Sequence, residues 1–263
     1  MQQAVEAKAE KKYVFLFREG DGRDKRLLGG KGAGLCEMTR IGLPVPPGFV
    51  ISTETCLDYF AGGFKLPRCL GEQTRAAMSD VEATMELGFG DPKRPLLVSV
   101  RSGAAISMPG MMDTVLNLGI NDATVQGLIR RSGNERFAWD SYRRFIQLFG
   151  SIVLNIDADE FHLAMEKHKQ QRGAKSDAEL TADDFKELTG VFKQIVVDRS
   201  GKPIPQEEFN ARIAGWLPSD SDRAFILSLM HGVYEHGKMA AWIAPPDRGI
   251  NNNPVDYEYV KLH

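Results

Sequence analysis

The sequence predicts an α/β fold in which a part of mixed strands and helices is followed by a helical part. Short apolar runs typical of strands recur up to Leu118, whereas apolar residues follow helical spacing between about residues 135 and 195. Glycine- and proline-rich turns separate the early segments. We therefore expect a mixed segment over 1–120, a helical segment over 121–206, and an unassigned segment over 207–263 that holds one helix and a loose tail.

The first part has the composition of alternating strands and helices. Strands are expected at residues 13–17, 45–52, 95–100 and 113–118. Three helices are expected. The first covers about residues 31–41 and ends before Gly42 and Pro44, the second begins after a cap at Ser52, and the third covers residues 74–87. The first of these helices follows a turn rich in glycine.

The second part is predicted to be helical throughout. Apolar residues at helical spacing predict helices over 135–149 and 157–168. Thr181 and Asp184 have the spacing of a capping box, and the helix that they begin is expected to reach about Ile195.

The pattern weakens from about Trp216 onward. One more helix is expected over 222–234. Residues 245–263 contain adjacent prolines, an asparagine triplet and no apolar period. Burial of this segment cannot offset the entropy lost on ordering it, so we expect a loop whose amide hydrogens exchange fast.

Composition excludes several classes of protein. The formal net charge of −2 gives no electrostatic reason to expect nucleic acid as a partner. Three cysteines without a CxxC pair argue against a disulfide framework or a zinc site, and the five histidines lack metal-ligand spacing. No apolar run reaches the ~20 residues of a membrane span, and the polar first residues lack a secretory core. We expect a protein that is not secreted, in the cytoplasm or, if a targeting segment exists, in an organelle lumen of the plastid or glycosome type.

The first candidate for chemistry is the segment from Leu28 to Gly34, which contains four glycines and Lys31 between a strand and a helix. Glycines such as Gly30 and Gly32 let a ligand approach the backbone, and the N–H groups of a helix start suit phosphate oxygens. Lys31 adds a mobile ammonium. The alternative is a glycine-rich helix start with a surface lysine, and neither standard nucleotide fingerprint is present.

Two further candidates follow the third predicted strand. Arg101 lies where that strand becomes loop, and its guanidinium matches phosphate geometry, although an arginine paired with a carboxylate is the alternative. Residues 107–114 contain three methionines around Pro109 and Gly110, which offer an adaptable apolar lip for a purine ring. A hairpin turn whose methionines fill the core is the alternative there.

Taken in order, these segments resemble the pyruvate phosphate dikinase family. The block Leu27–Phe49, LLGGKGAGLCEMTRIGLPVPPGF, is similar to the N-terminal block of that family, and Leu96–Asp122 is similar to its nucleotide-binding stretch. Arg136–Gly150 and Glu179–Leu188 look like its helical insert. The resemblance covers about residues 12–210.

The resemblance implies the first part of an ATP-grasp-like domain with an inserted helical subdomain. It implies a phosphotransferase that converts ATP, phosphate and pyruvate into phosphoenolpyruvate, AMP and diphosphate through a phosphohistidine. Arg101 then matches a catalytic position that, with Lys31, contacts the triphosphate. The other residues that the resemblance assigns to ATP binding are Gly30, Gly32, Ser102, Gly103, Met108, Gly110, Asp113 and Thr114.

The family's phosphohistidine segment does not occur in this sequence, and no part of it resembles the pyruvate-binding domain. We therefore expect those domains, and the ligands of a Mg²⁺ ion, to come from a longer chain, and we expect this chain alone not to complete the reaction. Two alternatives stay open. One is a non-catalytic nucleotide-binding or regulatory module. The other is a kinase similar to phosphoenolpyruvate synthase, although the segment SMPGMMDTVLN favours the dikinase over this alternative.

Overall fold

The computed structural model describes residues 11–63, 65–104, 114–204 and 239–244, with side chains except in 102–104 and 239–244. Its strands are β1 (Val14–Leu16), β2 (Phe49–Ile51), β3 (Gly88–Phe89), β4 (Pro95–Leu96), β5 (Val98–Ala104), β6 (Thr114–Leu118) and β7 (Met239–Ala244). Its α-helices are α1 (Lys25–Arg40), α2 (Thr53–Ala61), α3 (Leu70–Met85), α4 (Thr124–Ser132), α5 (Glu135–Leu148), α6 (Ala158–Arg172) and α7 (Ala182–Ser200). A π-turn, η1 (Phe149–Val153), and a 3₁₀ turn, η2 (Asp177–Glu179), complete the described elements.

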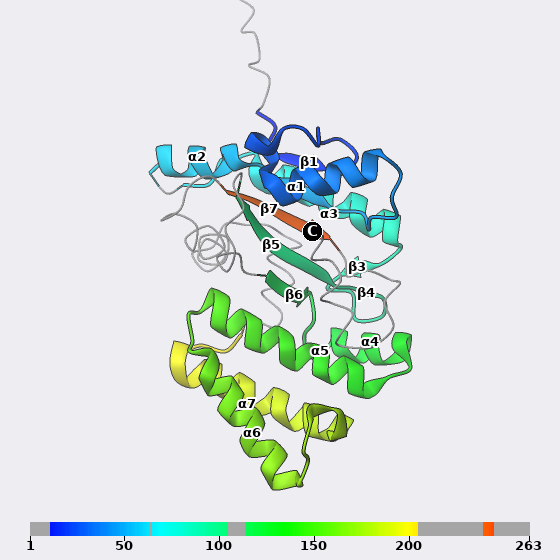
Figure 1. The fold of residues 1–263 in the computed structure, drawn as a ribbon, viewed down its shortest axis with the longest axis vertical. Coiled ribbons are helices and arrows are strands. Elements are labelled where there is room, and N and C mark those ends of the chain that lie inside the picture. The colour runs from blue at the N-terminus through cyan, green and yellow to red at the C-terminus, as the bar shows by residue number, and fades with distance from the viewer. Residues whose placement is uncertain (1–10, 64, 105–113, 205–238, 245–263) are drawn as a thin grey trace, which may run out of the picture.

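The main sheet has five strands in the order β1-β2-β7-β5-β6, and each neighbouring pair is antiparallel. The short strands β3 and β4 form a separate parallel pair. Figure 1 shows β7 beside β5, and in the sheet it lies between β2 and β5, although it comes from a much later part of the sequence. The expectation that 207–263 holds only a helix and a loose tail is therefore wrong for residues 239–244. The helix expected over 222–234 lies outside the described residues.

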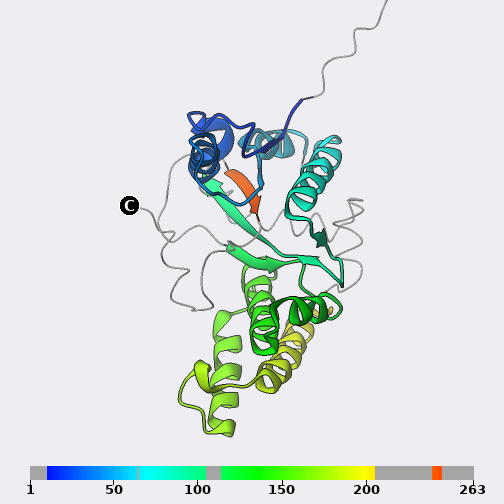
Figure 2. The ribbon, with the colours of Figure 1, turned by 90° about the vertical axis from the view of Figure 1, so that its right-hand side faces the viewer.

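The sheet buries a different apolar cluster on each face, because successive side chains of a strand point to opposite sides. Val50 packs in a small cluster with Leu28, Ala33 and Cys36 of α1. Its neighbour Phe49 belongs to the large cluster, together with the buried residues of α3. Accordingly, α1 and α3 lie on either side of the sheet in the rotated view (Figure 2).

Helices α4 to α7 gather beyond β6, at the opposite end of the molecule from α1 (Figure 1). Three of their aromatic side chains, Phe145, Phe161 and Phe192, are fully buried in the same large cluster as the sheet residues Val98 and Val115. The core therefore continues without interruption from the sheet into the helices. The division of the chain near residue 120 stays a prediction.

Several element boundaries differ from those predicted, for identifiable reasons. The strand expected over 45–52 is confined to Phe49–Ile51, since Pro46 and Pro47 have no N–H to donate to a sheet. The strand expected over 95–100 is divided between β4 and β5. The capping box at Thr181 and Asp184 is confirmed by reciprocal hydrogen bonds at the start of α7. Among the described residues, no helix is both long and apolar enough to cross a membrane.

Candidate nucleotide site between α1 and β5

The glycine-rich segment lies at a break within α1. Gly29 has φ 69° and ψ 164°, which is outside the helical region, while the residues on both sides are helical. This backbone conformation is essentially restricted to glycine. The helix therefore starts again at Gly30 and Lys31, as the sequence predicted, but the residues before Gly29 form a further helical turn that it did not predict. Asp24 caps that turn, and its carboxylate accepts a 2.9 Å hydrogen bond from the N–H of Leu27.

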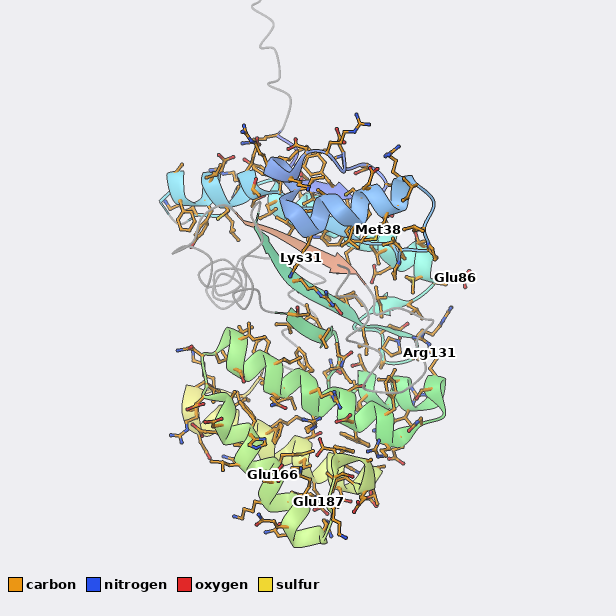
Figure 3. The ribbon with its side chains drawn as sticks, in the orientation of Figure 1. Lys31, Met38, Glu86, Arg131, Glu166 and Glu187 are labelled. Carbon is orange, nitrogen blue, oxygen red and sulfur yellow. The ribbon has the colours of Figure 1, made fainter. Side chains whose placement is uncertain are left out.

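The glycines of this segment serve different purposes. A Cβ on Gly32 would lie 3.0 Å from both methyl groups of Val50, so Gly32 allows α1 to approach β2 closely. A Cβ on Gly34 would meet nothing within 4 Å. Gly34 follows Lys31 by three positions and thus lies on the same side of the helix, where the surface is open. Figure 3 shows the Lys31 side chain extending from α1 on the side of the strands.

Packing around α1 fixes its position over the sheet. The hydroxyl of Thr53 donates a 2.5 Å hydrogen bond to the backbone carbonyl of Arg26. Gly20 lies so close to Cys36 that a Cβ there would be 2.4 Å from the Cys36 Sγ. Burial raises the pKa of the Cys36 thiol to about 11, which makes it an inert packing group rather than a nucleophile.

Arg101 lies within strand β5, whereas the sequence predicted a position where the strand becomes loop. In β5 it is directly opposite Thr114 of β6 on one side and Trp242 of β7 on the other. The side chain of Arg101 is half-buried, and this burial lowers its pKa. Because a guanidinium stays protonated over the physiological range even so, the sheet holds a permanent positive charge here.

Lys31 and Arg101 come together although seventy positions separate them in the sequence. Burial by surrounding protein atoms is the main cause that lowers the pKa of Lys31, and the positive charge of Arg101 lowers it further. Both effects disfavour its charged form, even though the side chain as a whole has much exposed surface. Two cations that are close enough to lower a pKa repel each other, and a polyanion bound near both would relieve the repulsion.

The remaining predicted site residues are described only in part. Thr114 lies beside Arg101 in the strand pair, and Gly30 and Gly32 are in α1 next to Lys31. Ser102 and Gly103 continue β5 and pair with Ala241 and Ala240, but their side chains are not described. Met108, Gly110 and Asp113 lie outside the described residues. In the part that is described, no group of three or more His, Cys, Asp or Glu residues is arranged to hold a metal ion.

A second polar cluster lies far from this site, on α6 and α7. Asp184 is buried and accepts hydrogen bonds from Thr181 and His168, while Arg172 forms an ion pair with it at 2.7 Å. The sequence indicated the capping box but gave no sign of the histidine and arginine partners, which come from another helix. An open cavity lies beside this cluster, and its lining carries more carboxylates than cations: Arg172, Gly173, Ala174, Glu179, Thr181, Asp183, Asp184 and Glu187. This lining is unsuited to a phosphate group.

Known proteins are similar to most of this chain. Residues 25–65, which contain α1, β2 and α2, match the family described as "Pyruvate phosphate dikinase, AMP/ATP-binding domain". The chain is 53% identical over 196 residues to pyruvate, phosphate dikinase of Entamoeba histolytica, and this match covers 74% of the chain. It is 50% identical over 208 residues to the chloroplastic enzyme 1 of Zea mays and 45% identical over 227 residues to the enzyme of Clostridium symbiosum, which cover 78% and 84% of the chain.

The chain is homologous to part of the pyruvate phosphate dikinases. It spans 22% of the length of the Entamoeba and maize proteins and 26% of the clostridial one. The relatives are thus roughly three and a half times as long as this chain, and the similarity concerns the part of them that this chain represents.

Proposed function

We propose that this chain is the ATP-binding part of a phosphotransferase of the pyruvate phosphate dikinase type, and that the triphosphate of ATP binds between α1 and β5. The packing of α1, which carries Lys31, on β5, which carries Arg101, supports this proposal, and the charge of Arg101 accordingly contributes to the lowered pKa of Lys31. In this proposal the sheet and α1 to α3 are the first part of an ATP-grasp-like domain. Helices α4 to α7 are the inserted helical subdomain.

The two cations would neutralise the phosphate oxygens from two directions, Lys31 from the helix and Arg101 from the sheet. Phosphoryl transfer depends mainly on positioning and charge stabilisation, which is chemistry that such a pair can supply. Backbone N–H groups at the restart of α1, at Gly30 and Gly32, would add donors to the same phosphates. Arg101 is the residue to which we assign a catalytic contact.

The residues that follow β5 would complete this wall of the site. In the proposal, Ser102, Gly103, Met108, Gly110, Asp113 and Thr114 lie over the triphosphate. Thr114 is directly opposite Arg101 in the strand pair, which supports its place at the edge of such a site. The ligands of a Mg²⁺ ion, the phosphohistidine domain and the pyruvate-binding domain would belong to further segments of a longer chain, as the length of the relatives suggests.

Titration of ATP and Mg²⁺ against the chain, followed by NMR chemical shifts, tests the assignment. With one wall of the site, the wild-type chain should bind ATP weakly, at millimolar concentrations. Each charge-assisted contact to phosphate is worth about 1.5–3 kcal/mol. Lys31→Ala or Arg101→Ala should therefore weaken binding at least about tenfold.

Lys25→Ala is the matched control, since Lys25 is an exposed lysine at the start of the same helix, before the break at Gly29. It should bind ATP as the wild type does. Circular dichroism establishes that all three variants fold. Equal affinity of Lys31→Ala and Lys25→Ala would refute the site, and absence of any shift with ATP would refute nucleotide binding by this chain.

A further inference from the structure

The central strand of the main sheet comes from a part of the sequence remote from its neighbours. Strand β7 is paired with β2 on one side, where Ile51 is opposite Ala241, and with β5 on the other, where Ser102 is opposite Ala241. Its pairing with β5 extends from Ser99 to Ala104. The other strands of this sheet are β1 and β2 on one side and β5 and β6 on the other.

Without β7 the sheet would be divided into two pairs of strands. Two-stranded ribbons are at best marginally stable, and each would present an edge of unpaired N–H and C=O groups toward the gap. Helix α1 contacts both β5 and β7, and it packs on β2 through Gly32 and Val50. The two pairs are therefore held on either side of a slot that fits one extended segment.

The segment that fills the slot suits transfer between molecules. Residues 239–244, MAAWIA, contain no charge, proline or glycine, which is the composition of a segment that pairs readily as a strand. Between Ile204, the last described residue before it, and Met239 lie residues 205–238, 34 in number. A chain of that length can extend over at most about 110 Å, which exceeds the size of a domain of this kind.

We infer that the slot between β2 and β5 also accepts residues 239–244 of a second copy of this chain, so that two copies exchange their β7 strands. Every contact of β7 would be kept in such an exchange, because both slots and both strands are identical. The connecting residues give the strand of the same molecule a high effective concentration, which favours the monomer in dilute solution. Exchange is therefore expected when the chain refolds at high concentration.

Exchange would also affect the candidate nucleotide site, provided that the proposed function is correct. Arg101 is directly opposite Trp242, so the strand beside Arg101 would come from the partner copy. Each site would then be incomplete without the other molecule. The exchange itself is tested without nucleotide, so its failure and the failure of ATP binding are distinguishable.

Crosslinking between two variants provides the test. One copy carries Ile51→Cys and the other Ala241→Cys, at positions directly opposite each other in β2 and β7. Opposed residues of antiparallel strands lie within the Cα separation that a disulfide spans. The native cysteines, Cys36, Cys56 and Cys69, are all buried. After unfolding, mixing and refolding at rising protein concentration, the pair should give a disulfide-linked heterodimer whose fraction rises with concentration.

Two controls keep the outcome specific. Leu163→Cys replaces Ile51→Cys in a parallel mixture, because Leu163 is 66% exposed on α6 and is not opposite β7. That mixture should give no heterodimer above background. The double variant Ile51→Cys/Ala241→Cys, refolded in dilute solution, should close a disulfide within one chain. If the double variant closes and the mixture of single variants never crosslinks at any concentration, exchange is excluded, and if neither closes, β7 does not occupy the slot.

Discussion

Asp184 is a carboxylate that remains charged although it is 6% exposed. Burial alone would raise its pKa. Hydrogen bonds from the backbone N–H and hydroxyl of Thr181, a hydrogen bond from His168 and the charge of Arg172 outweigh burial and lower the pKa to about 2. Because the folded state binds the proton less tightly than the unfolded state does, Asp184 stabilises the fold above its ordinary pKa of 3.8. This stabilisation is lost as the pH falls from about 4 toward 2.

Asp184→Asn should therefore destabilise the chain by about 1–2 kcal/mol at pH 7, through loss of the capping box and of the charge that faces Arg172. Urea unfolding at pH 7, 4 and 2.5 measures the difference from the wild type, which should shrink as the pH falls. Asp183→Asn is the matched control, since Asp183 is an exposed neighbour in the same first turn. It should change the stability by less than about 0.5 kcal/mol. A difference for Asp184→Asn that stays constant with pH would contradict the assignment.

The local residue patterns selected some residues of the candidate site, but only the family resemblance implied that Lys31 and Arg101 contact the same triphosphate. Lys31 stood out because it lies among glycines, and Arg101 because it follows an apolar strand. Each signal was local. Their proximity arises from the packing of α1 on β5 and β7, which joins segments seventy positions apart and which no local pattern encodes. The same reasoning explains why the partners of Asp184 on α6 were not predicted.

At the scale of elements, α1 shows how one backbone angle shapes a helix. Gly29→Ala should cost about 1–3 kcal/mol, because the φ of 69° and ψ of 164° at this buried position suit glycine only. Gly34→Ala, five positions later in α1, should be neutral or stabilise by up to about 1 kcal/mol, because its Cβ meets nothing and alanine favours a helix.

Urea unfolding at neutral pH compares the two alanine variants with the wild type. Both changes add one methyl group to the same helix, so their difference isolates the backbone conformation at Gly29. A cost for Gly34→Ala as large as that for Gly29→Ala would show that the break within α1 does not govern the stability of this element.

Elements with a strong local signal were predicted more accurately than those that depend on partners. The capping box fixed the start of α7 because both hydrogen-bonding residues lie within one turn. The apolar runs located β1 and β6 to within a few residues. In contrast, the helical turn before Gly29 was not predicted, and α4 was not predicted as a separate helix within the segment expected to be helical. The first is stabilised partly by the contact between Thr53 and Arg26, which is not visible in a local pattern.

At the scale of the whole molecule, the sheet depends on a segment whose place could not be predicted from its local sequence pattern. The run MAAWIA is short and follows residues with weak periodicity, so its local pattern did not distinguish a strand from a loop. Its place becomes evident only from its pairing with β2 and β5. A central strand of six residues is thus the main feature of the fold that could not be predicted.

Two truncations test the importance of this strand. A chain that ends at residue 238 lacks β7 and should lose cooperative unfolding, because the two strand pairs are no longer joined. A chain that ends at residue 244 keeps β7, and we expect it to unfold like the full chain, since residues 245–263 have no apolar pattern that would support packing. Thermal unfolding followed by circular dichroism distinguishes them. Equal melting curves for both truncations would refute a structural role for β7.

The late position of β7 in the sequence has a consequence for folding while the protein is being synthesised. A ribosome synthesises β2 and β5 long before residues 239–244, and at about 5–20 residues per second the residues between them take roughly 7 to 27 seconds. During that interval the nascent chain carries two strand pairs with open edges toward the vacant slot. Such edges are prone to aberrant pairing with other chains. Nascent molecules on one polysome are close neighbours, so this topology exposes them to pairing between copies while they are being synthesised.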